Sequence, residues 1–115
     1  MAAVAAAAGT GARSMTPAAP IDLLALARSA PQAWRSQVCG VAAGAQVKVL
    51  RMDAQAYPDE VHDFDEALLV LQGQMNLEIG GARHVVQAGE VFIVPAGMPH
   101  AVAPGSHGTL VILDR

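Results

Sequence analysis

The sequence has a single cysteine, Cys39, in 115 residues. One cysteine excludes an internal disulfide and any zinc module built from several cysteines. A lone cysteine in an apolar stretch usually serves as a small buried side chain, so no catalytic role is expected for Cys39. Aromatic residues make up only 3% of the chain, which leaves few side chains able to stack on bases or sugars.

Grouped positive charge is also missing from the chain. The 7 lysine and arginine residues are scattered among 10 acidic ones, for a net charge of -3. A phosphate backbone is bound by clustered positive charge, so no nucleic-acid partner is expected. No apolar run reaches the length of a membrane span, and the alanine-rich start lacks the basic and strongly apolar regions of a secretory signal. These absences predict a cytoplasmic protein with no membrane partner.

Large apolar side chains are almost missing from residues 1–20, which are mainly alanine, glycine, proline, serine and threonine. Such a segment buries too little surface to become ordered, so a flexible tail is expected there. Met15 offers an alternative start of translation within it. Residues 21–115 are enough for a single domain with one modest core. The 24 alanines add little to that core, because each buries a small area.

A short helix is expected at the start of the domain. Asp22 can cap it, and Leu23, Leu24, Leu26 and Ala27 would form its apolar side. A proline soon afterwards ends the helix or begins the next turn.

Beyond this helix the sequence alternates short apolar segments with turn residues. No helix-length connection separates them, which disfavours a parallel sheet. Many short strands at this spacing predict an all-β sandwich or barrel, with hairpin turns at Gln72-Gly73-Gln74 and Gly80-Gly81. The expected strands are 37–42, 46–52, 58–62, 66–72, 75–79, 83–87, 91–94, 100–103 and 109–113.

The segment 66–72 is apolar on both faces of its expected strand. Leu68 and Val70 lie on one face, while Leu69 and Leu71 share the other. One face can line a barrel interior, so the other needs a cover. The N-terminal helix, a second sheet or a partner chain could provide this cover. If a second copy of the chain provides it, the protein is a homodimer, which is the state we expect.

Half of the acidic residues lie in the eight-residue window 59–66, with His62 in its middle. Alternate residues of a strand point the same way, so Glu60 and His62 would share a face. With a turn at 63–65, Glu66 would begin the next strand. Glu60, His62 and Glu66 are therefore expected to converge across a hairpin.

A second histidine, His100, follows the segment Pro95-Ala96-Gly97-Met98-Pro99, whose two prolines stiffen it. Imidazole nitrogens and carboxylate oxygens are the ligand mixture that divalent Mn, Fe, Ni, Cu or Zn ions accept. Two histidines with one or two carboxylates leave positions open for water or substrate. The alternative is a solvated acidic turn with ordinary histidines. The sequence predicts a metal site and leaves that alternative open.

Two stretches resemble the motifs of the cupin family. The first is Glu60-x-His62-x3-Glu66-x6-Gly73, and the second is Gly89-x5-Pro95-x-Gly97-x2-His100. The second matches the family pattern at all four of its glycine, proline, glycine and histidine positions. The resemblance implies a cupin-type antiparallel β-barrel, a jelly-roll-like double sheet, with a divalent metal held by Glu60, His62, Glu66 and His100.

The chain departs from the cupin pattern at three positions. Glu60 stands in place of the first histidine, Ala54 in place of a leading glycine, and Pro104 in place of a closing asparagine. A glutamate keeps a possible ligand but adds negative charge, which favours harder ions such as Mn or ferrous Fe. It is equally compatible with a barrel that binds no metal.

Three functions remain open at this point. The first is a metal-dependent enzyme that acts on a small molecule inside the barrel. The second is a non-catalytic module that binds or senses a small molecule, with or without a metal. The third is a structural barrel whose motif residues have no ligand. Similar barrels carry many chemistries, so the fold does not select a reaction or a substrate.

Overall fold

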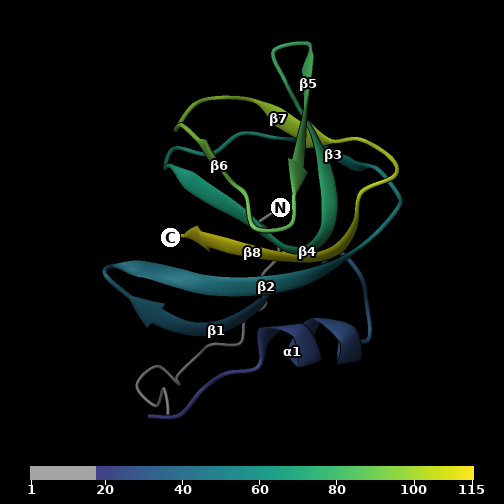
Figure 1. Ribbon diagram of the computed structural model, residues 1–115. Coiled ribbons are helices and arrows are strands. Elements are labelled where there is room, and N and C mark those ends of the chain that lie inside the picture. The colour runs from purple at the N-terminus through teal and green to yellow at the C-terminus, as the bar shows by residue number, and fades with distance from the viewer. Residues whose placement is uncertain (1–17) are drawn as a thin grey trace.

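The structure is a computed structural model that describes residues 18–115. Most of the expected tail over residues 1–20, with Met15, lies outside the described residues. The described chain forms one short helix followed by eight strands (Figure 1). Their bounds are α1 Leu23–Ser29, β1 Gln37–Ala42, β2 Ala45–Asp53, β3 Tyr57–Glu60, β4 Glu66–Ile79, β5 Ala82–Gln87, β6 Val91–Val94, β7 His100–Val102 and β8 His107–Asp114.

All strand pairs are antiparallel, and hydrogen bonds join them in the order β1-β2-β8-β4-β7-β3, with β5 and β6 also on β4. The sheet curls on itself around β4. The first half of β4 pairs with β6 and β8, and the second half pairs with β5 and β7. Two layers therefore face each other, which confirms the all-β barrel with a short N-terminal helix.

Helix α1 begins where the sequence predicts. The carboxylate of Asp22 accepts a hydrogen bond from the Ala25 amide at 3.0 Å, which satisfies one of the free amides of the first turn. Ala27 is buried, and Leu23 and Leu26 pack beside it on the outer face of β2 and β8. The helix lies below β1 and β2 in Figure 1. With only seven residues it is far too short to cross a membrane, and residues 18–115 contain no other helix.

The core fills the space between the two layers. Leu68, Val70, Leu77, Leu110 and Ile112 are each fully shielded from solvent there. Period-two alternation places them all on the inward face of their strands. The outward-facing Leu69 packs against the cluster of Ala27, Val49 and Val111, so part of the second apolar face of β4 is covered on the side where α1 lies.

The expected hairpin at Gly80-Gly81 is confirmed. Ile79 pairs with Ala82 across a two-residue turn, and both glycines have positive φ. This is the conformation that favours glycine in tight hairpins. The expected hairpin at Gln72-Gly73-Gln74 is wrong, because β4 continues through it as one bent strand of 14 residues.

Gly73 is where β4 bends from one layer to the other. Its φ is 82°, it pairs with Gly108 of β8, and the pairing shifts by one residue just before it. A Cβ atom at Gly73 would overlap the backbone of His107, and one at Gly108 would overlap the backbone of Gln72. The glycine therefore allows two backbones to touch instead of ending a strand.

We expect Gly73→Ala to lower the free energy of unfolding by about 2–4 kcal/mol, from positive-φ strain plus backbone overlap. The matched control is Gly44→Ala, because Gly44 also has positive φ (77°) but no atom lies within 4 Å of its added Cβ. In the control only the backbone strain should lower the free energy of unfolding, by about 1–2 kcal/mol. Urea unfolding of both variants measures the difference, and equal losses would contradict the close approach at Gly73.

Candidate metal centre

Three of the four predicted ligands lie at strand ends inside the barrel. Glu60 ends β3, Glu66 begins β4 and His100 begins β7. Glu60 pairs directly with His100. The expected hairpin between β3 and β4 is wrong: β3 pairs with β7, because the start of β4 is already taken by β6 and β8.

His62 lies just beyond β3 and not within a strand as expected. Two hydrogen bonds, one to a backbone carbonyl and one to a side chain, hold its loop against the stiff segment before His100. The Gly97 amide donates to the His62 carbonyl at 2.7 Å, and the Ala96 amide donates to Asp65 Oδ1 at 2.9 Å. The His62 ring also stacks on Phe64, with centroids 4.9 Å apart. These contacts bring the two motifs together.

The ligand atoms of Glu60, His62 and His100 all lie within 4.8 Å of one another. His62 Nε2 lies 3.1 Å from Glu60 Oε1 and 3.9 Å from Glu66 Oε2. His100 Nε2 lies 3.2 Å from Glu66 Oε1. The sequence therefore predicted a set of residues that the fold does bring together.

The orientation of His100 is set by the backbone. Its Nδ1 lies 3.0 Å from the Met98 carbonyl oxygen, which only accepts hydrogen bonds, so Nδ1 carries the hydrogen. Nε2 of the neutral ring then presents a lone pair to Glu66 Oε1, which is also an acceptor. Two facing acceptors at 3.2 Å need a cation or a proton between them. A histidine held at Nδ1 by a carbonyl is the usual arrangement of a metal ligand.

Glu66 is fully buried, and its Oε2 makes no hydrogen bond to any residue in 18–115. Burial raises the pKa of this carboxyl, but the close contacts with the His100 ring and with Asp114 lower it by more, so its pKa lies below the ordinary value. Burial lowers the pKa of His62, and the nearby His100 lowers it too, against the attraction of Glu66. At neutral pH the centre therefore combines an anionic carboxylate with a neutral imidazole, the forms that bind a metal.

Two charged residues beside this centre were not foreseen. Lys48 of β2 and Asp114 of β8 are 4% and 3% exposed, and Lys48 Nζ lies 2.8 Å from Asp114 Oδ1. Burial and the neighbouring Glu66 raise the pKa of Asp114, while Lys48 opposes them. Strand alternation could have indicated this burial, since Lys48 lies two residues from the inward-facing Leu50 and therefore on the same face of β2.

Comparisons with known proteins agree with this architecture. Residues 49–114 match the Cupin domain family profile. Over 58 residues, half of this chain, the sequence is 38% identical to quercetin 2,3-dioxygenase of Bacillus subtilis (strain 168). The matched segment is only 17% of the length of that enzyme.

Two solved structures share the fold at low sequence identity. A cupin-2 domain containing protein from Shewanella frigidimarina has a TM-score of 0.75 and 22% identity, over 83% of this chain and 94% of that one. Protein NMB1881 from Neisseria meningitidis has a TM-score of 0.73 and 20% identity, over 84% and 98% of the two chains. With the profile match over more than half of its length, this chain belongs to the Cupin domain family, as a small cupin barrel with a His/Glu group that could hold a metal ion.

Proposed function

We propose that the protein binds one divalent transition metal ion through His62, Glu66 and His100, with Glu60 as the fourth ligand. The ion would serve to bind or transform a small molecule inside the barrel. The observation that carries this proposal is the facing pair of acceptors, His100 Nε2 and Glu66 Oε1, at 3.2 Å inside a buried site. The other two proposed ligands, Glu60 and His62, place their ligand atoms within 4.8 Å of that of His100.

Glu60 bears on the choice of ion. Two carboxylates and two imidazoles form a harder ligand set than three imidazoles and one carboxylate, which favours Mn or ferrous Fe over Ni, Cu or Zn. Four protein ligands on such an ion leave positions for water or substrate. A bound ion would supply Lewis acidity there, or lower the pKa of a bound water molecule. Dioxygenase chemistry is one candidate, because the 38% identical relative carries that activity in its name.

A metal-free binding or sensor module is the second candidate. A proton on His100 would also satisfy the facing acceptors, as an imidazolium paired with the Glu66 carboxylate. In that case the barrel interior alone would bind the small molecule. Metal content separates the two candidates. A ligand that binds and is recovered chemically unaltered would indicate a sensor and not an enzyme.

Protein purified without chelator should contain about one transition metal ion per chain by elemental analysis. Adding the preferred ion to stripped protein at 100 times its dissociation constant should raise the melting temperature by about 10 °C or more, because binding then adds about 2.7 kcal/mol to a domain of this size. Absence of metal, together with an unchanged melting temperature in Mn, Fe, Ni, Cu and Zn, would contradict the metal proposal and favour the second candidate.

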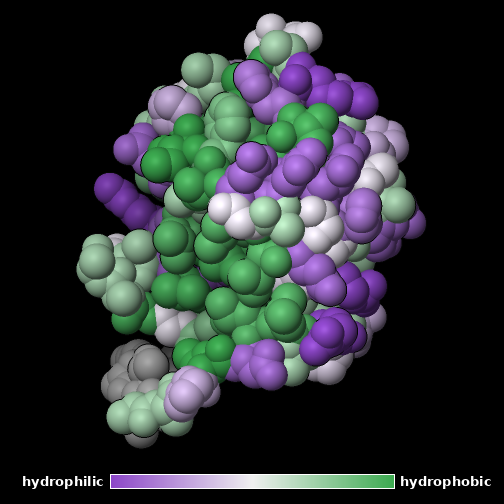
Figure 2. Space-filling view, viewed as in Figure 1, coloured by the Kyte–Doolittle hydropathy of each residue, from purple (hydrophilic) through white to green (hydrophobic). Residues whose placement is uncertain are grey.

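A homodimer is also part of the proposal. The outer face of β2, β8, β4 and β6 keeps exposed apolar side chains that α1 does not cover, and Ile93 (61% exposed) and Val91 (53%) are the most prominent. Figure 2 shows a band of hydrophobic side chains down the side on which β6 and the end of β8 lie. We define the outer patch as Ala67, Leu71, Val91, Ile93 and Leu113.

A second copy of the chain is the partner that best fits the outer patch, since a twofold contact places the same apolar surface on both sides. We expect Ile93→Lys to convert a dimer to a monomer in light scattering, because it places a charge in the apolar centre. Val85→Lys is the control, as Val85 is 48% exposed on β5 in the other layer. A monomeric wild-type protein at high concentration would contradict this prediction.

A cytoplasmic location belongs to the same proposal. Its support is the single free cysteine, because a chain without disulfides suits a reducing compartment. Cell fractionation with an antibody to the protein tests it.

A further inference from the structure

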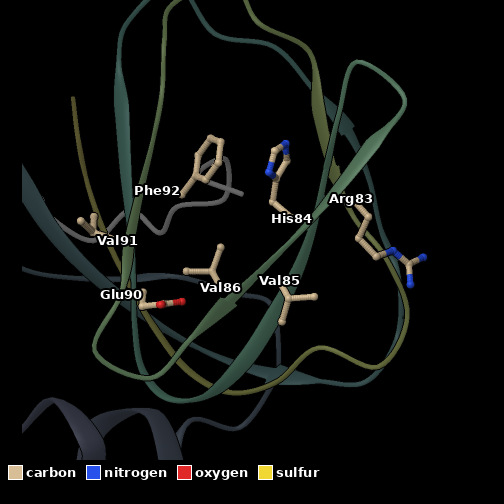
Figure 3. A pocket seen from close by; sticks show the side chains of 7 residues that line it. All are labelled: Arg83, His84, Val85, Val86, Glu90, Val91 and Phe92. Carbon is tan, nitrogen blue, oxygen red and sulfur yellow. The ribbon is translucent and has the colours of Figure 1, made fainter.

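A hollow lies on the side of the barrel, between β5 and β6. Its volume is about 610 Å³, within the range of small-molecule pockets. No predicted metal ligand lines it. Figure 3 shows its lining, which consists of Arg83, His84, Val85, Val86, Glu90, Val91 and Phe92.

The hollow exists because the barrel wall is open at this point. β5 pairs with the second half of β4 and β6 pairs with the first half, so the two strands belong to different layers. Within residues 18–115 no strand pairing joins β5 to β6, which are linked only by the turn 88–90. The hollow is therefore a side opening between the layers.

Register shows that two rings point inward at this opening. His84 pairs with the buried Leu77, and Phe92 pairs with the buried Leu68, so each shares the inward face of its partner. Their ring centroids are 5.1 Å apart and the planes meet at 51°. In Figure 3 the two rings lie side by side above Val86, which is 4% exposed. They form an apolar surface with an imidazole at its edge.

The same register places the hollow next to the candidate metal centre. On one layer His84 lies opposite Leu77, and His100 lies opposite Ile79, the next inward residue of β4. On the other layer Phe92 lies opposite Leu68, one inward residue from Glu66. By this register the two inward-facing rings of the hollow lie one side-chain row from the centre.

The charged residues at the rim are already engaged. Arg83 pairs with Glu78 at 3.2 Å, and Glu90 Oε1 accepts a hydrogen bond from the Gln87 amide at 2.8 Å. The exposed His84 ring, by contrast, makes no hydrogen bond to any residue within 18–115. His84 is therefore the polar group that this hollow offers to a ligand.

We propose that this hollow is a binding site for a flat ring compound that carries a hydrogen-bonding oxygen, of the phenol type. The ring packs on Phe92 and Val86, since aromatic rings gain from offset or edge contacts with one another. The oxygen forms a hydrogen bond with the His84 ring. Binding at this site needs no metal, so it does not depend on the function proposed above.

The test uses 4-fluorophenol and fluorine NMR on the full chain in EDTA. We expect a dissociation constant of about 1 mM, as is usual for so small a ligand. Phe92→Leu and His84→Gln should each weaken binding by about 3- to 10-fold. The matched control is His107→Gln, because His107 is also an exposed histidine but lies at the start of β8. It should bind as the wild type does.

His62→Ala is included to place the ligand. It removes a proposed metal ligand and should leave 4-fluorophenol binding unchanged. Loss of binding in this variant would mean that the compound binds at the metal centre, and would overturn the proposal. So would the absence of wild-type binding at 10 times the expected constant, or equal affinity in His84→Gln and the wild type. His84→Gln decides the matter even if Phe92→Leu unfolds, because His84 is exposed.

Discussion

Replacing His100 by alanine is expected to lower metal affinity by at least about 100-fold, since even the loss of an outer-sphere partner weakens metal sites by 10- to 100-fold. His100 is 3% exposed, and its Nε2 is directed at Glu66 by the bond from Nδ1 to the Met98 carbonyl. No other described histidine is placed to replace it. Elemental analysis and calorimetric titration with Mn measure the loss.

His62→Ala should act in the same direction, because His62 Nε2 lies 3.1 Å from Glu60 Oε1 at the same point. His107→Ala is the control, since its exposed ring hydrogen-bonds only to the Gly105 carbonyl among the described residues. Full metal occupancy in either site variant would remove that residue from the centre. The rise in melting temperature on adding metal should disappear with the occupancy, which separates lost binding from a general loss of stability.

Asp114→Ala is expected to destabilise the fold by about 3–5 kcal/mol, because it leaves the ammonium group of Lys48 buried without its partner. The two side chains are 5% and 0% exposed, with Nζ and Oδ1 2.8 Å apart. The double variant Lys48→Met, Asp114→Leu removes both charges and keeps the volume, so it should lose far less. Urea unfolding of the metal-free protein compares the two.

The control for this pair is Glu78→Ala, which breaks the ion pair with Arg83. Those side chains are 53% and 47% exposed, so the change should be below about 1 kcal/mol. If Asp114→Ala and the double variant lose the same stability, the buried charge is not the cause. If Asp114→Ala lowers the free energy of unfolding as little as the Glu78→Ala control does, water reaches the ammonium group of Lys48.

Gly73 illustrates what the sequence alone could not decide about the fold. A glycine between two polar residues is typical of a hairpin turn, so a break in the strand was the natural interpretation. The structure instead uses Gly73 to bring β4 against Gly108 of β8, 35 positions further along the chain. A contact between such distant residues leaves no local signal, because each glycine by itself is compatible with a turn.

The candidate centre shows the same limit. The spacing of His62, Glu66 and His100 predicted the residues that meet, but local pairing predicted the wrong partner strand for β3. Lys48 and Asp114 were missed because a charged residue on a strand usually faces water. Burial becomes acceptable only when both are brought together from β2 and β8.

The sequence by itself determined the strand-rich character, the capped helix at Asp22, and the two motifs that end at Gly73 and His100. These are local properties of spacing, turn chemistry and side-chain alternation. Tertiary structure alone decided how β4 bends between the layers, which atoms face one another at 3.2 Å in the centre, and where the wall opens between β5 and β6. The physical reason is that each of these depends on the register between strands far apart in the chain, and register follows from packing the whole barrel at once.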